Sequence, residues 1–228
     1  TPAPGLPPRS PTLADTLNAR FRRSPYTAMW RDDGLLPDAG LLIHVFDGWE
    51  DGEKSYLPTS NGPGAVGMSC SMIFAEQLTA GNTLTRALFN GGATGIILRP
   101  GVTKLSCGKP DDTGGECKDR VCPWRSKVEI PFNEGEDKFC NWPPKTFGVE
   151  LQRLTEWQAA SQRLMYNEII VDSPHWRAHM PDIIEGIYGN RQAHEEFLRA
   201  YASHGVSTQT HPFLSFDPSN WKSPFSIA

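Results

Sequence analysis

The chain has 228 residues, a formal net charge of −4 and a hydrophobic content of 38%. This length suits one hydrophobic core, and the 21 glycines and 20 prolines indicate a single domain with long loops. The acidic balance argues against nucleic-acid binding, and no apolar run approaches the roughly 20 residues that a membrane-spanning helix needs.

The chain begins with a proline-rich segment. Residues 1–11 contain five prolines, which predicts an extended arm in front of a single domain over residues 12–228. The spacing of Leu13, Leu17 and Phe21 predicts an amphipathic helix over residues 12–23 with Thr12 as its N-cap. We interpret the nearby arginines Arg20, Arg22 and Arg23 as a solvated helix end.

Apolar runs predict strands in the first half of the domain. Residues 41–46 read as a strand that leads into an acidic turn. Residues 68–75 alternate well enough for a strand, although they could also open a helix that runs to Leu78. Residues 95–99 predict another strand, which ends at a Pro-Gly turn, and we expect residues 103–107 to return against it.

The second half predicts helices and strands in alternation. Residues 147–165 read as one long helix, which leads into the strand 166–172. Ser173 and Pro174 predict a helical turn with Ser173 as N-cap, and a proline turn at Pro181 precedes the next strand.

Two more segments complete the chain. A charged helix is expected over residues 191–204, followed by an extended tail over residues 212–225. Four aromatic residues of this tail are expected to pack on the core: Phe213, Phe216, Trp221 and Phe225. These elements predict an α+β domain with a mixed, largely antiparallel sheet.

The cysteines indicate the compartment. Cys107, Cys117, Cys122 and Cys140 lie in a segment with few core residues, so two disulfides would hold the insertion 107–140 and leave Cys70 as a buried free thiol. The alternative is a structural zinc site, but the paired CxxC spacing typical of zinc is absent from the sequence. We therefore expect a secreted or lumenal protein.

Glu168 is the leading candidate for chemistry. It stands at the head of the apolar run in the predicted strand 166–172, and a carboxylate beside a buried strand is costly unless it is paired or used. The simple alternative is that Glu168 forms an ion pair with an arginine such as Arg99.

Short motifs around Glu168 resemble the ADP-ribosyltransferase-like toxins and effectors. The apolar strand behind Glu168, then Pro181 and the strand over residues 183–188, is similar to the last strand pair of that family. His44 on an early strand, followed by Ser69-Cys70-Ser71, matches the family's order of a His or Arg, a Ser-x-Ser strand and a catalytic Glu. The spacer from Asp172 to Pro181 is longer than usual, and the cysteine insertion is foreign to the pattern.

This resemblance implies an activity and a site. NAD would be the substrate, and Glu168 would be the catalytic carboxylate. His44 would hold the adenosine ribose, Ser69 and Ser71 would brace Glu168, and Trp49 or Tyr166 would stack on the nicotinamide. The acceptor of ADP-ribose, a protein or a small molecule, is not specified.

Three further motifs cover residues 44–50 (His-Val-Phe-Asp-Gly-Trp-Glu), 166–172 (Tyr-Asn-Glu-Ile-Ile-Val-Asp) and 220–225 (Asn-Trp-x-x-Pro-Phe). With them the chain as a whole also resembles a group of secreted microalgal proteins, which implies secretion and no particular activity.

Other patterns give alternatives. His175 and His179 are four apart and would share a helix face, but an HExxH arrangement is missing and Pro181 is expected to end the helix. The acidic run over residues 47–53 does not follow the alternating spacing of a calcium loop. We therefore expect no bound metal. The second candidate function is a non-catalytic module that binds glycan or protein through four loop tryptophans: Trp30, Trp49, Trp124 and Trp142.

Overall fold

A computed structural model describes the backbone of residues 10–45, 67–79, 94–109, 142–161, 167–189, 211–217 and 219–227, with a few helical residues between 194 and 202. The arm over residues 1–9, the acidic turn and most of the cysteine insertion lie outside these ranges. The helices are α1 (Leu13–Phe21), α2 (Ala75–Thr79), α4 (Phe147–Ser161) and α5 (Ser173–Ile183), with 3₁₀ turns at Pro25–Thr27 and Pro144–Thr146.

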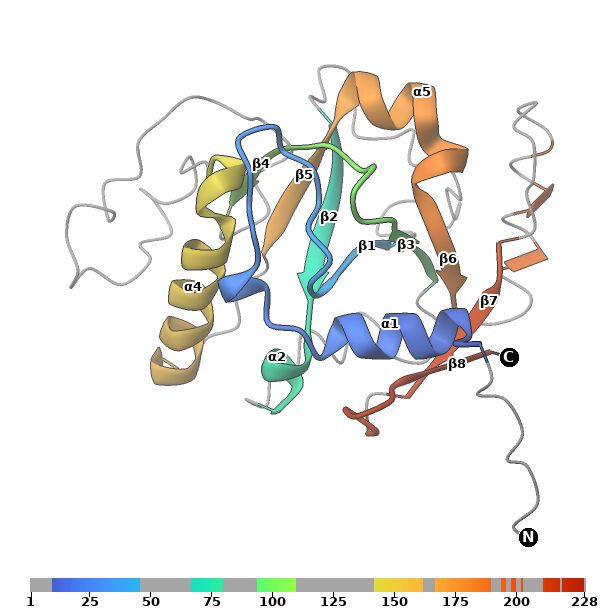
Figure 1. The fold of residues 1–228 in the computed structure, drawn as a ribbon, viewed down its shortest axis with the longest axis horizontal. Coiled ribbons are helices and arrows are strands. Elements are labelled where there is room, and N and C mark those ends of the chain that lie inside the picture. Colours follow the sequence, from blue (N-terminus) through green and yellow to red (C-terminus); the bar gives the residue numbers. More distant parts are fainter. Residues whose placement is uncertain are drawn as a thin grey trace, which may run out of the picture.

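Eight strands form one sheet in the order β4-β5-β2-β1-β3-β6-β7-β8 (Figure 1). Their bounds are Leu41–Val45 (β1), Gly67–Ile73 (β2), Gly95–Leu98 (β3), Leu105–Lys109 (β4), Glu168–Asp172 (β5), Ile184–Tyr188 (β6), Phe213–Phe216 (β7) and Phe225–Ile227 (β8). Every neighbouring pair is antiparallel except β6 and β7. The predicted α+β class with a mixed, largely antiparallel sheet is thus confirmed.

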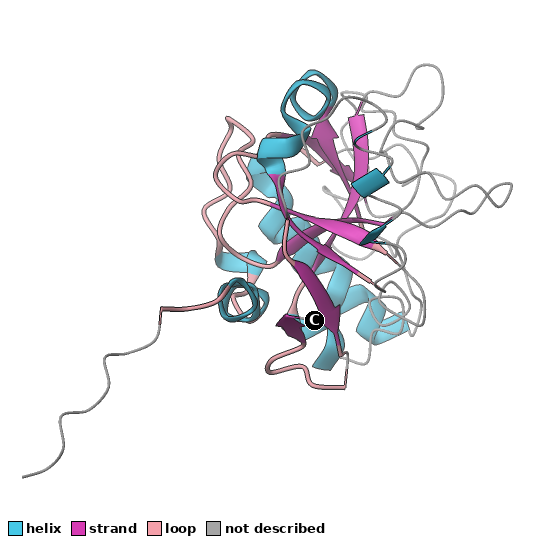
Figure 2. Cartoon of the chain, turned by 90° about the vertical axis from the view of Figure 1, so that its right-hand side faces the viewer, coloured by secondary structure: helices cyan, strands magenta, loops and turns pink. Residues whose placement is uncertain are grey.

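The two faces of the sheet carry different apolar clusters. Leu41, Ile43, Ile73 and Ile97 pack with the buried face of α1. Residues of the opposite parity, including Leu42, Met72 and Ile96, pack with α4 and α5. This alternation follows from the two-residue period of a strand. Figure 2 shows the strands fanning out between helices that pack on the sheet's sides.

Helix α1 begins as its sequence predicts. The Thr12 hydroxyl accepts from the Asp15 N–H at 3.2 Å, and the Asp15 carboxylate accepts from the Thr12 N–H at 2.8 Å. This reciprocal capping box satisfies two backbone donors that a helix N-terminus otherwise leaves unpaired.

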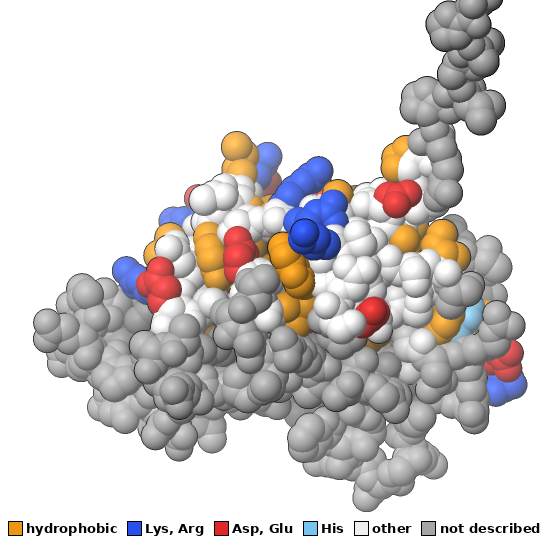
Figure 3. Space-filling model, turned by 90° about the horizontal axis from the view of Figure 1, so that it is seen from below, with side chains coloured by type: hydrophobic (Ala, Val, Ile, Leu, Met, Phe, Trp, Pro, Cys, Tyr) orange, Lys and Arg blue, Asp and Glu red, His pale blue; other side chains and the backbone are white. Residues whose placement is uncertain are grey.

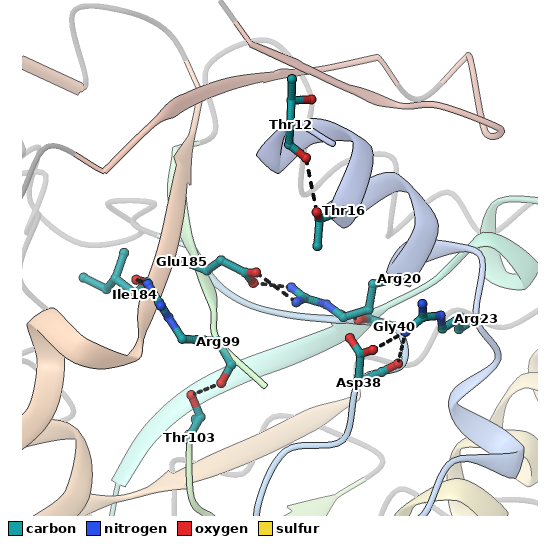
Figure 4. A network of polar contacts seen from close by, with 10 residues as sticks. All are labelled: Thr12, Thr16, Arg20, Arg23, Asp38, Gly40, Arg99, Thr103, Ile184 and Glu185. Atoms are coloured by element: carbon teal, nitrogen blue, oxygen red, sulfur yellow. Dashed lines mark hydrogen bonds and ion pairs between the residues drawn. The ribbon is translucent and has the colours of Figure 1, made fainter. Parts of the chain in front are cut away.

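The interpretation of Arg20 as solvated is wrong. Its side chain is 2% exposed and forms two hydrogen bonds with the Glu185 carboxylate, at 3.1 and 2.5 Å (Figure 4). Its Nε also donates to the Gly40 carbonyl at 3.2 Å. Arg20 therefore ties the last turn of α1 to β6 and to the turn before β1. Arg22 and Arg23 are exposed, as predicted, and on the face seen in Figure 3 basic and acidic side chains are interspersed.

Three predictions in the second half need correction. Residues 105–109 form β4, which pairs with β5 and not with residues 95–99. Asp172, not Ser173, is the N-cap residue of α5, and Pro174 occupies the first turn. Pro181 does not end the helix, because α5 continues to Ile183 after a break at His179.

Pro181 is tolerated because it stands just after this break. His179 has φ −123° and ψ 17°, so the helical segment that follows begins anew. A proline in a first helical turn lacks only an N–H that would have had no partner inside the helix.

Two aromatic predictions have different outcomes. Phe225 is 3% exposed and packs edge-on against Phe21 and Phe216, as expected of the tail. Trp221 is 41% exposed, so the prediction that it packs on the core is wrong. It lies in the turn between β7 and β8, where the Lys222 ammonium is 5.5 Å from its ring centre.

Candidate functional site

The candidate site lies where strand β2 changes partners. Its second half pairs with β1, Ser71–Ile73 opposite Ile43–Leu41, and its first half pairs with β5, Gly67–Cys70 opposite Asp172–Ile169. Beyond Ile43, strand β1 pairs with β3 through His44 and Val45. The pairing of β1 with β2 therefore stops at Ser71, although both strands belong to one sheet. We call this point, near Ser69, the division of the sheet. His44 lies on one side of it and Glu168 on the other.

Ser69 and Glu168 meet at this division. The Ser69 hydroxyl donates to Glu168 Oε1 at 2.6 Å, and Glu168 is 1% exposed. A hydrogen bond to an ionised carboxylate is about twice as strong as one between neutral groups. The bond thus fixes one oxygen of a buried acid at a chosen position.

His44 contacts the same segment from the other side. Its Nδ1 lies 2.6 Å from the backbone oxygen of Ser69. A carbonyl only accepts hydrogen bonds, so Nδ1 carries a proton and donates it. Burial lowers the pKa of His44, although the bond to Ser69 acts in the opposite direction. The ring is consequently neutral near pH 7, and its Nε2 is a hydrogen-bond acceptor.

Ser71 has a different environment from Ser69. Its side chain is 2% exposed, and within the described part of the chain its hydroxyl has no hydrogen-bond partner. Of the two serines expected to brace Glu168, the structure brings only Ser69 into hydrogen-bond contact with it. Trp49 and Tyr166, expected at the nicotinamide, lie outside the described residues.

Arg99 does not neutralise Glu168. Its Nη2 donates to the Ile184 carbonyl at 3.3 Å, and its own carbonyl accepts from Thr103 Oγ1 at 2.7 Å (Figure 4). The simple alternative of a Glu168–Arg99 ion pair is therefore not what the structure contains.

A buried amide that the sequence reading missed fixes the start of β5. Asn167, the residue before Glu168, accepts from the Met72 N–H at 2.7 Å and donates to the Met72 carbonyl at 3.0 Å. Gln77 of α2 donates to the same carbonyl at 3.2 Å. The Asn167 side chain thus acts as one more rung between β5 and β2. The available signal was an asparagine at the mouth of an apolar strand.

Cys70 neighbours the site and is a buried free thiol, as predicted. Burial and the charge of Glu168 raise the pKa of this thiol well above its ordinary value. A protonated, enclosed thiol is unreactive. Cys70 therefore serves as packing between β2 and its neighbours.

Two of the four tryptophans expected on a binding surface pack inside the fold instead. Trp142 is fully buried, and Trp30 donates its Nε1–H to the Pro25 carbonyl at 2.7 Å while its ring packs against Phe147. Trp49 and Trp124 lie outside the described residues.

The comparisons with known proteins add no relative. A scan against protein-family models found no family that matches the chain, and a search of curated proteins found no match. Of the helices that the structure describes, none is long and apolar enough to cross a membrane.

Proposed function

We propose that this protein is an ADP-ribosyltransferase-like enzyme that cleaves NAD and transfers ADP-ribose, with Glu168 as the catalytic carboxylate. The observation that carries the proposal is the Ser69–Glu168 hydrogen bond at the division of the sheet, with His44 bonded to the Ser69 backbone. Three separate strands supply these residues, in the chain order His, Ser-x-Ser, Glu that the resemblance implies.

The chemistry requires a fixed negative charge beside a sugar. When the bond between the ribose C1′ and the nicotinamide nitrogen breaks, its electron pair leaves with nicotinamide and the ribose gains positive charge. A carboxylate hydrogen-bonded to the ribose 2′-hydroxyl stabilises that charge more in the transition state than in the ground state. The acceptor's nucleophile then bonds to C1′ and loses a proton.

His44 suits the second role of the proposal. A neutral imidazole whose Nδ1–H is committed to the Ser69 carbonyl has in Nε2 the kind of acceptor that a ribose hydroxyl needs. The same hydrogen bond holds the ring across the division from Glu168. The acceptor of ADP-ribose stays open between a protein and a small molecule.

The test is nicotinamide release from NAD by the purified chain. We expect turnover in the wild type and its loss in Glu168→Gln, which keeps the side-chain shape and removes the charge. Glu156→Gln, which changes an exposed carboxylate on α4, is the matched control and should retain full turnover. Absence of turnover in the wild type, together with no shift of the melting temperature by NAD, would refute the proposal.

We also propose that the chain is secreted or lumenal, with two disulfides among Cys107, Cys117, Cys122 and Cys140. The buried free thiol of Cys70 supports this count, because it leaves an even number of cysteines for pairing. Alkylation of the unfolded, non-reduced chain should modify one thiol, and five after reduction. Five reactive thiols without reduction would contradict the pairing.

The binding-module alternative has less support. It rests on four loop tryptophans, and the two that the structure describes, Trp30 and Trp142, are used in packing. We therefore prefer the enzyme.

A further inference from the structure

The only candidate metal ligands that the sequence placed on one helix face lie together in the structure. The ring centres of His175 and His179 on α5 are 5.2 Å apart, with an angle of 43° between the ring planes. Two imidazoles that bind the same ion, each through a nitrogen about 2.0–2.1 Å from a tetrahedral metal, have ring centres about 5 Å apart. The observed spacing already matches that of a chelating pair.

His175 is prepared for ligation at one nitrogen. Its Nε2 is shielded from solvent and has no hydrogen-bond partner within the described part of the chain.

The second ligand is accessible. His179 is exposed, so its ring can turn toward an ion at small cost.

We propose that His175 and His179 form a binding site for one divalent transition-metal ion of the class that prefers imidazole, such as Zn²⁺ or Ni²⁺. Within the described residues no group of three or more His, Cys, Asp or Glu lies together, so these residues supply two imidazole ligands to the ion. The site joins the first helical segment of α5 to the break at His179. This revises the sequence-based expectation of no metal, which rested on the missing HExxH arrangement and on a helix ending at Pro181.

The ion would stabilise the connection between strands β5 and β6. Helix α5 joins β5, which carries Glu168, to β6, which carries Glu185. Chelation by His175 and the break residue His179 stabilises the folded state by mass action, because the unfolded chain does not hold the two rings together. The inference does not depend on the NAD chemistry and is tested without it.

The experiment is calorimetric titration of the metal-stripped protein with Zn²⁺ and, separately, Ni²⁺. We expect one ion per chain in the wild type and an affinity at least about tenfold weaker in His179→Ala. Because His179 is exposed, this variant should melt at the wild-type temperature when a chelator is present. His194→Gln, which alters a histidine stacked on Phe213, is the control and should keep wild-type affinity.

Several outcomes would overturn the inference. One is no binding by the wild type at millimolar Zn²⁺ or Ni²⁺, and another is equal affinity in His179→Ala. A third is an intense thiolate-to-metal absorption with Co²⁺ that persists in His179→Ala, because it would assign the ion to the cysteines.

Discussion

Ser69 and Ser71 stand two residues apart on β2, yet their hydroxyls have different surroundings. Ser69 donates to Glu168, whereas within the described residues the Ser71 hydroxyl has no partner. The two serines should therefore differ in function, although the motif presents them as a pair.

Ser69→Ala should lower NAD turnover about 10- to 100-fold, because a hydrogen bond to a charged group is worth about 1.5–3 kcal/mol. Ser71→Ala should leave turnover near the wild-type value and should not reduce stability, since it removes a buried hydroxyl without a partner. Initial rates of nicotinamide release and thermal melting measure both effects. Equal losses of turnover in the two variants would contradict the assignment of Ser69 as the positioning residue.

At the scale of single residues, unusual side chains could be identified from the sequence, but the residues that they contact could not. Glu168 and His44 were identifiable, because a carboxylate or an imidazole on an apolar strand is unusual. The burial of Arg20 was not, because its partner Glu185 is 165 residues away and each residue alone resembles an exposed charge. The pairing of Asn167 with Met72 was hidden in the same way.

At the scale of elements, the start of β5 depends on a side chain. Asn167 satisfies both the N–H and the carbonyl of Met72, and it is 8% exposed. This rung holds the residue before Glu168 against the strand that carries Ser69. Strand position and site geometry are thus connected through one amide.

Asn167→Ala should reduce the free energy of unfolding by about 1–3 kcal/mol, because it leaves the buried Met72 N–H without its acceptor. Urea unfolding measures the change. Gln152→Ala, which removes an exposed amide bonded to Glu156, should change stability by less than about 0.5 kcal/mol. A comparable loss in both variants would show that the Met72 contact does not matter.

Local pattern predicted most elements but not their pairing. The runs at Ile96–Leu98 and Ile169–Val171 are apolar and rich in β-branched residues, so they read as strands without further context. The partner of β4 could not be read in this way, because strand order depends on contacts between residues far apart in sequence. The continuation of α5 through Pro181 depended on the break at His179, which leaves no local signature.

At the scale of the whole molecule, buried histidines make stability depend on pH. His211 is 9% exposed and lies beside Arg99 and His194. Burial, then the charges of Arg99 and His194, lower the pKa of His211. Between this lowered value and the ordinary value of about 6.5, the unfolded chain binds a proton that the folded chain does not. Stability therefore falls as the pH decreases through this window.

His211→Gln should make that fall less steep, by up to about 1.4 kcal/mol per pH unit. The measurement is the free energy of unfolding at several pH values between about 5 and about 7.5, with a chelator present. The exposed substitution Gln152→Ala, which changes no titratable group, serves as the comparison and should leave the slope close to that of the wild type. An unchanged slope in His211→Gln would remove His211 as a source of the pH dependence.

The position of β5 in the sheet also determines when the site can assemble. This strand lies between β4 and β2, although about sixty residues separate its sequence from the end of β4. During synthesis, β2 and β4 therefore leave the ribosome with unpaired edges that wait for residues 168–172. Unpaired strand edges are prone to pair with other chains. The interval before Glu168 takes its place is thus the period in which the nascent chain most needs protection from aggregation.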